Sequence, residues 1–162
     1  MRYILLCICL LSLLGCGIDI KTQQDTKPTT TANEQAKTIQ GQDEHVIAAK
    51  QALSSGNYNK TIEELTIAIN VNANNAEAYS IRGFATALNG DIAKGLIDTK
   101  KAYDLDPNNV ANYYNMAMVY KLQGQLNDSK QWFEKVLEKD PSNTWSVYGI
   151  ATIYADQGDD TK

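Results

Sequence analysis

The sequence predicts an all-α protein: a solenoid of stacked antiparallel helix pairs, with three complete pairs and one extra helix. Two columns of residues repeat along the chain with the same step of 34 residues. The first column is made of glycines: Gly56, Gly90, Gly124 and Gly158. The second is made of small residues: Ala49, Gly83, Ala117 and Ala151. Between these marks apolar residues recur at helical spacing, and no segment alternates as a half-buried strand would.

The repeat divides the chain into units of helix, turn, helix and closing turn. We place complete units at 42–75, 76–109 and 110–143, and a partial unit that has only its first helix at 144–162. Each glycine is predicted to end a first helix, because glycine adopts the left-handed backbone of such a turn at least cost. The complete units close on Asn75, Asn109 and Asn143. A single unit cannot bury its apolar face, so the stack is the stable object.

The second and third units resemble the tetratricopeptide repeat. In the second unit the family's characteristic positions hold Tyr79, Gly83, Gly90, Ala102 and Pro107. In the third they hold Tyr113, Ala117, Tyr120, Gly124, Phe133, Val136 and Pro141. The resemblance covers 42–160. It implies a right-handed α-solenoid whose first helices line a concave groove for a protein or peptide partner.

The middle unit has two unusual residues in its second helix and a pair of oppositely charged residues on its two helices. Gly95 stands where alanine is usual, and Thr99 stands where an aromatic residue is usual, so we expect this unit to pack less tightly than its neighbours. Arg82 and Asp98 occupy positions that bring polar side chains of the two helices together. We interpret them as a structural ion pair rather than a ligand contact, because such pairs are common in helical proteins.

The N-terminus resembles a bacterial lipoprotein signal. After Arg2, an apolar run of twelve residues from Tyr3 to Leu14 is shorter than the about 20 residues that span a bilayer. Leu13, Leu14, Gly15 and Cys16 then follow the lipobox pattern. The resemblance implies a signal peptide over 1–15, lipidation of Cys16, and a palmitate-bearing N-terminus. An ordinary secretory signal and a short membrane anchor are the alternatives.

Residues 16–41 form the predicted tether between this anchor and the repeats. They are rich in Thr, Gln and Lys and poor in large apolar residues, so they cannot bury enough surface to offset the entropy of ordering. We expect the protein at the cell membrane or outer membrane, facing the periplasm or the extracytoplasmic side. The sequence leaves the type of host envelope open.

The composition argues against several classes of function. The 15 basic and 19 acidic residues give a formal net charge of −4, which disfavours nucleic acid as a partner. His45 is the only histidine, and the three cysteines all lie within the first sixteen residues. No phosphate-binding loop or metal-ligand cluster is present. We therefore predict a protein that is not an enzyme and that uses no cofactor or metal.

The partner-binding residues are predicted from the groove positions of the resembling family. The carboxylate clamp by which some members bind chaperone tails is absent, since Val46 and Ile81 occupy two of its positions. Aromatic residues and methionine, typical anchors of peptide segments, gather toward the C-terminal half instead. Several of them are equally compatible with a role in the core between units. The predicted groove residues are Lys50, Phe84, Tyr114, Met118, Lys121, Trp145 and Tyr148.

These observations predict a membrane-tethered scaffold that binds a peptide segment or protein partner, acting in envelope assembly or maintenance. A pilotin-type assembly factor for a pilus or secretin is the alternative, and an accessory subunit of an enzyme is a weaker one. The partial last unit keeps apolar residues on its single helix. That helix either meets a partner, forms a homodimer, or belongs to a chain cut short of its natural end, and the sequence leaves all three open.

Overall fold

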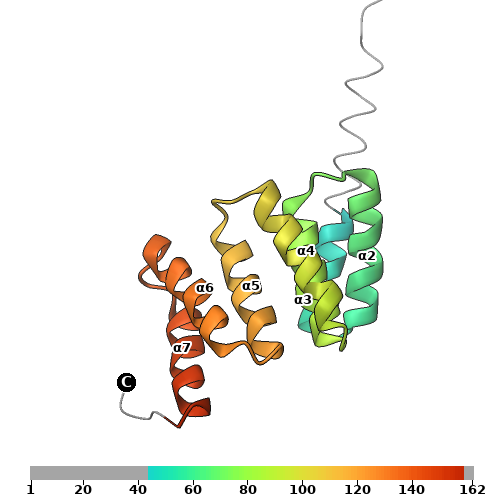
Figure 1. Ribbon diagram of the computed structural model, residues 1–162. Coiled ribbons are helices and arrows are strands. Elements are labelled where there is room, and N and C mark those ends of the chain that lie inside the picture. Colours follow the sequence, from blue (N-terminus) through green and yellow to red (C-terminus); the bar gives the residue numbers. More distant parts are fainter. Residues whose placement is uncertain (1–43, 159–162) are drawn as a thin grey trace, which may run out of the picture.

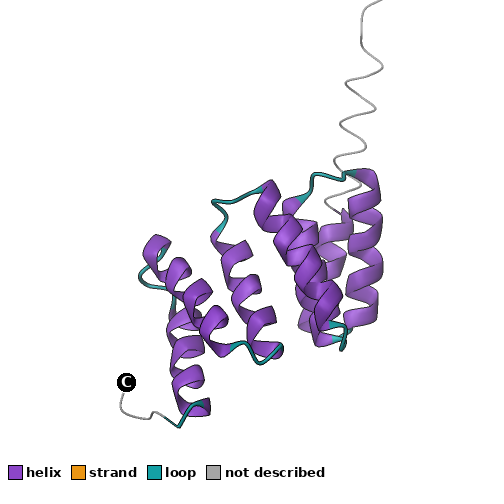
Figure 2. Ribbon diagram, in the orientation of Figure 1, coloured by secondary structure: helices purple, strands orange, loops and turns teal. Residues whose placement is uncertain are grey.

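The computed structural model describes residues 44–158, and every regular element in this range is a helix (Figures 1 and 2). The helix that covers 44–54 in the described part, called the first helix below, precedes six others. These are α2 (Tyr58–Val71), α3 (Ala76–Leu88), α4 (Ile92–Leu105), α5 (Val110–Leu122), α6 (Leu126–Lys139) and α7 (Thr144–Asp156). The predicted all-α solenoid of antiparallel helix pairs is confirmed. The signal peptide, Cys16 and the tether lie outside the described residues.

The turns and helix ends follow from a few residues that recur with the period. The four turn glycines have φ of 70°, 103°, 79° and 74°, the left-handed region in which a side chain is strained. The asparagine that closes each unit also begins the next first helix. Asn75, Asn109 and Asn143 accept hydrogen bonds from the backbone N–H groups of Ala78, Ala111 and Ser146. These side chains satisfy donors that the first turn of a helix leaves unpaired.

A hydroxyl group joins the two helices of the first and third pairs. Thr61 Oγ1 donates to the carbonyl of Ala49 at 3.4 Å, and Ser129 Oγ donates to that of Ala117 at 2.8 Å. One period separates Thr61 from Gly95, and another separates Gly95 from Ser129. The middle pair therefore has no such hydroxyl at this position.

The middle pair instead packs backbone against backbone. A Cβ placed on Gly83 would lie 2.7 Å from the carbonyl oxygen of Gly95. A Cβ on Gly95 would lie 2.5 Å from that of Gly83, so neither site has room for a side chain. The prediction that the middle unit packs less tightly is wrong, because the two glycines face each other and bring α3 and α4 into direct contact.

A buried amide fastens the next junction. Asn112, near the start of α5, is fully buried, and its Nδ2 donates to the carbonyls of Ala102 at 3.1 Å and Asp106 at 3.0 Å. Both carbonyls belong to the C-terminal end of α4, and each also accepts a hydrogen bond from a backbone N–H group. Asn112 therefore ties the third pair to the second.

The C-terminal pair has its own apolar core, built around Phe133 of α6. Ala117, Phe133 and Ile153 are fully buried there, with Tyr114, Met118, Leu126, Trp132 and Ile150 packed around them. Gly149 of α7 lies over the Phe133 ring, since a Cβ on this glycine would be 2.6 Å from the ring carbons. Ala151, which the small-residue column placed between paired helices, is exposed, because no second helix covers α7 within residues 44–158.

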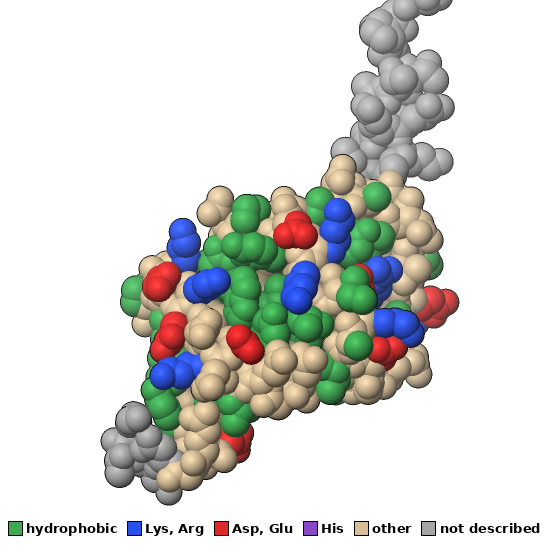
Figure 3. All heavy atoms as spheres, in the orientation of Figure 1, with side chains coloured by type: hydrophobic (Ala, Val, Ile, Leu, Met, Phe, Trp, Pro, Cys, Tyr) green, Lys and Arg blue, Asp and Glu red, His purple; other side chains and the backbone are tan. Residues whose placement is uncertain are grey.

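An aromatic cluster joins α4, α5 and α6. The Tyr103 and Trp132 rings meet edge to face at 5.2 Å, and both contact the Tyr113 ring. Lys135 Nζ lies 3.7 Å from the centroid of the Trp132 ring. Figure 3 shows hydrophobic side chains gathered in the middle of the face over these helices. In the described part of the chain, no helix combines the length and the apolar character needed to cross a bilayer.

Candidate functional site

An open groove of about 520 Å³ lies between the N-terminal halves of α5 and α7. Its lining is mainly apolar and aromatic, with an amide at each of two positions. We call this set the groove: Val110, Ala111, Tyr114, Asn115, Asn143 and Trp145. Clefts of this kind, with few polar groups, are typical sites for an apolar side chain of a ligand.

The helix caps and the Phe133 core hold the groove in place. Asn143 begins α7 through the bond from Ser146 N to its Oδ1, at 3.0 Å. Tyr114 packs against Phe133 at 5.7 Å between ring centroids, nearly edge to face. Burial raises the pKa of the Tyr114 phenol, so this group is neutral at physiological pH. The groove wall formed by α5 is therefore uncharged.

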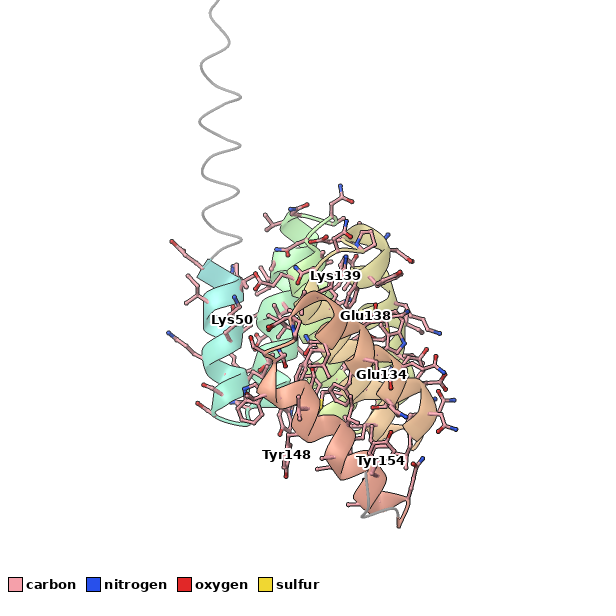
Figure 4. The ribbon with its side chains drawn as sticks, turned by 90° about the vertical axis from the view of Figure 1, so that its left-hand side faces the viewer. Lys50, Glu134, Glu138, Lys139, Tyr148 and Tyr154 are labelled. Carbon is pink, nitrogen blue, oxygen red and sulfur yellow. The ribbon has the colours of Figure 1, made fainter. Side chains whose placement is uncertain are left out.

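The α7 wall carries two strongly exposed aromatic side chains. Trp145 is 69% exposed and Tyr148 is 66% exposed. They lie three residues apart and so on the same face of α7. Together with Thr144 they line a second hollow of about 260 Å³ beside the groove. In Figure 4 Tyr148 points out on the side where Lys50 also projects, the side of the first helix.

The structure brings three of the seven predicted groove residues together: Tyr114, Trp145 and Tyr148. Lys50 lies far from them, on the first helix, where its Nζ pairs with Glu77 of α3 at 2.7 Å. Phe84 is half-buried on α3 and does not line the groove.

The other two predicted residues are engaged inside the fold. Met118 lies one turn beyond Tyr114 and packs against the Phe133 core, because α7 covers this part of α5. Lys121 Nζ contacts Thr152 Oγ1 at 2.5 Å and thereby joins α5 to α7. The core role that the sequence left open therefore applies to Met118.

Four groove residues are absent from the predicted set: Val110, Ala111, Asn115 and Asn143. Asn115 Nδ2 donates to Ser80 Oγ at 2.9 Å, so its amide is oriented by α3. Val110 and Asn143 lie at the starts of α5 and α7, where the asparagine column had marked unit boundaries. The asparagine column could have indicated Val110 and Asn143, because the groove is lined by the starts of α5 and α7.

A separate hollow of about 460 Å³, away from the groove, surrounds the Arg82 and Asp98 pair. Arg82 Nε donates to Asp98 Oδ2 at 2.7 Å, and Nη2 donates to Oδ1 at 3.0 Å. Arg82 Nη1 also donates to Thr66 Oγ1 at 3.3 Å. The guanidinium thus links α2, α3 and α4 through three of its hydrogen bonds. This geometry fits the structural interpretation of the pair.

A charged cluster joins the first helix to α2. Glu64 is nearly buried, with Oε2 2.6 Å from His45 Nδ1 and Oε1 2.7 Å from Lys60 Nζ. Lys60, and then His45, lower the pKa of the Glu64 carboxyl by hydrogen bonding to its ionised form. Within residues 44–158 no three His, Cys, Asp or Glu side chains come together in a way that could hold a metal ion.

Comparison with known proteins agrees with the architecture. The family model described as "Tetratricopeptide repeat" matches residues 99–131, from the middle of α4 to the first half of α6. No curated protein sequence matches the chain.

Several solved structures share its fold. The Arabidopsis OM64 TPR domain has a TM-score of 0.65 at 20% identity, over 72% of this chain and 96% of that one. The first TPR of Spaghetti (RPAP3), bound to an HSP90 peptide, has a TM-score of 0.67 at 18% identity, over 74% and 97%. The second TPR domain of human RPAP3, in complex with an HSP70 peptide, has a TM-score of 0.59 at 25% identity, over 69% and 97%. The chain thus has a tetratricopeptide-repeat fold, with the family's sequence signature in residues 99–131.

Proposed function

We propose that this protein is a non-catalytic scaffold that binds an extended peptide segment of a partner protein in the groove between α5 and α7. The observation that carries the proposal is the exposure of Trp145 and Tyr148 beside an apolar groove. Exposed aromatic residues next to a hollow are frequent anchors of binding energy. Two structures with the same fold are complexes with peptides, which supports a peptide as the class of partner.

The partner segment that fits this groove is uncharged and carries a bulky apolar side chain. The α5 wall holds the neutral phenol of Tyr114, and no charged residue lines the groove. The two lysines that the sequence predicted for the groove already have partners: Lys50 pairs with Glu77, and Lys121 contacts Thr152. An acidic chain terminus would therefore find no cation to offset the loss of its hydration. Asn115, whose Nδ2 is held by Ser80, supplies an amide oxygen that can accept a hydrogen bond from peptide backbone.

The location of this scaffold is a second part of the proposal. The run from Tyr3 to Leu14 followed by Gly15 and Cys16 supports export and attachment through lipid on Cys16. Two or more acyl chains on one residue hold a protein stably at a membrane. The scaffold then acts at the cell envelope, in its assembly or maintenance.

The groove is tested by affinity measurements on single-residue variants. A library of uncharged peptides with one central aromatic or aliphatic residue is screened against the full chain, and the best binder is labelled. Trp145→Ala and Tyr148→Ala should each weaken its binding by about 2 kcal/mol, roughly 30-fold, as expected for an anchor residue. Val147→Ala is the matched control, because Val147 is exposed on α7 but does not line the groove.

The outcome that would refute the groove is equally specific. If Trp145→Ala and Tyr148→Ala bind the peptide as the native chain does, the binding surface lies elsewhere. If the library yields only acidic binders, the proposed chemistry of the partner is wrong.

The membrane attachment is tested by fractionating cells that express the chain. Cys16→Ser should move the protein from the membrane to the soluble fraction and abolish incorporation of labelled palmitate. Cys9→Ser, inside the predicted signal peptide, should change neither. Retention of the Cys16→Ser protein at the membrane would favour the alternative of a short membrane anchor.

A further inference from the structure

A second apolar surface lies on the other side of α7, away from the groove. Val147, Ile150, Ala151 and Tyr154 recur there at steps of three and four residues and so form one stripe. With Leu137 of α6 they line a hollow of about 220 Å³. We call this set the end surface. None of its residues belongs to the groove.

The solenoid itself shows what normally covers such a stripe. One period earlier, on α5, the same positions hold Tyr113, Met116, Ala117 and Tyr120. The first three are buried and Tyr120 is half-buried, and α6 packs against α5 as the second helix of the pair. On α7, by contrast, Val147 is 53% exposed and Ala151 is exposed. Within residues 44–158 no helix covers the end surface.

The charges around the end surface are of both signs. Glu134 and Glu138 lie one turn apart on α6, and Lys139 follows them, as Figure 4 shows. Lys130 is engaged by the surface itself, with Nζ 3.7 Å from Glu134 and 4.8 Å from the centroid of the Tyr154 ring. Glu138 and Lys139 have no ion-pair partner among the described residues. A rim that carries both signs can pair with a copy of itself, carboxylate against ammonium.

We propose that the end surface binds the end surface of a second copy of this chain, forming a dimer in which the two α7 helices pack antiparallel. A two-fold axis near Ala151, the middle of the stripe, matches each apolar residue with one of the partner copy. Alanine at the crossing lets two helix backbones approach closely. Trp145, which lines the groove, lies on the side of α7 opposite Val147 and Tyr154, so each copy keeps its groove open, and the dimer is independent of the proposed peptide site.

Sedimentation equilibrium of the full chain tests the proposal. The native chain should follow a monomer–dimer equilibrium, and Val147→Asp should weaken the dimer at least about tenfold by placing two carboxylates in an apolar contact. Because Val147 is exposed in the monomer, this variant should keep the native helix content by circular dichroism. Trp145→Ala, on the opposite face of the same helix, should leave the dimer constant unchanged.

Cross-linking tests the geometry. In a chain whose Cys7, Cys9 and Cys16 are serine, Ala151→Cys should form a disulfide-linked dimer on mild oxidation. Ala93→Cys is the matched control, an exposed alanine on α4 that should stay monomeric under the same oxidant. A native chain that remains monomeric at high concentration, a dimer that Val147→Asp does not weaken, or equal cross-linking at positions 93 and 151 would each overturn the proposal.

Discussion

Gly83 and Gly95 face each other across the middle helix pair, each with its carbonyl oxygen where a side chain of the other would have to be. The distances from the two hypothetical Cβ atoms to these oxygens are 2.7 and 2.5 Å. The pair therefore replaces the hydroxyl bond of the neighbouring pairs by direct backbone contact. Glycine here is required by space, since neither residue has a left-handed backbone.

Gly95→Ala separates two effects of opposite sign. Alanine in the interior of a helix should stabilise by about 1 kcal/mol from helix propensity alone. Overpacking against Gly83 and Ala87 should cost more, so we expect a net loss of about 1–2 kcal/mol in the free energy of unfolding. Urea denaturation followed by circular dichroism measures it.

The control for this substitution is Ala93→Gly in the same helix, at an exposed position, which should cost about 1 kcal/mol. A Gly95→Ala protein that is more stable than the native chain would show that α3 and α4 can separate at no cost.

Asn112→Ala should loosen the junction between the second and third pairs. The variant loses two buried hydrogen bonds to carbonyls at the end of α4, and we expect a loss of about 1–3 kcal/mol. Asn127→Ala, at an exposed position near the start of α6, should change stability by about 0.5 kcal/mol or less. Equal effects of the two substitutions in thermal unfolding would mean that water replaces the amide at the junction.

Glu64 predicts a pH dependence of stability. Lys60 and His45 lower the pKa of its carboxyl in the folded chain, so the folded state binds its proton less readily than the unfolded state does. The stabilisation is therefore fully present above the ordinary pKa of about 4.3, and it is lost as the pH falls further through the lowered folded pKa.

Glu64→Gln removes this contribution. The variant should be less stable than the native chain at neutral pH, and the difference should shrink on acidification from about pH 5 to about pH 3. Glu63→Gln, on an exposed neighbour that also faces Lys60, is the control and should show little change. A difference that stays constant across this range would mean that the interaction does not depend on the charge of Glu64.

Arg82→Lys tests the fork geometry of the ion pair in the middle unit. Lysine keeps the charge but cannot donate two parallel bonds to Asp98 and a third to Thr66. We expect a loss of about 1–2 kcal/mol in thermal unfolding, above that of an exposed pair, because both side chains are largely covered. Lys94→Gln, in the exposed pair with Asp91, should have little effect. If Arg82→Lys were as stable as the native chain, the pair would stabilise the fold by its charges alone and not by the geometry of the guanidinium.

The helix pairs could be predicted from the sequence because each requirement is local. A glycine with positive φ, an asparagine cap and an apolar stripe act within a few residues, so a constant step of 34 residues reports them directly. The packing of the middle pair could not be predicted from the usual residue at each family position. This packing depends on Gly83 and Gly95 facing each other across the helix pair. A comparison with the family residue at each single position does not show which two positions come into contact.

The candidate site was only partly predictable for a related reason. Trp145 and Tyr148 project from α7 and are exposed, as a partner-binding role requires. Met118 and Lys121 lie on the same helix as Tyr114, but α7 packs over them and takes them into the core or a polar contact. Whether a residue of α5 is covered depends on how closely α7 approaches α5. Both helices contact the Phe133 ring of α6, α5 through Tyr114 and α7 through Gly149.

The linear order of the contacts has a dynamic consequence. Among the described helices, extensive contacts run between helices one or two places apart along the chain, and α7 contacts mainly α6. In such a stack the terminal element opens with less free energy than the middle, and amide hydrogens of α7 should exchange faster than those of α3 and α4. The groove spans this last junction. A peptide bound between Tyr114 and Trp145 would stabilise the packing of α7. Peptide binding should therefore slow the exchange of the amide hydrogens of α7.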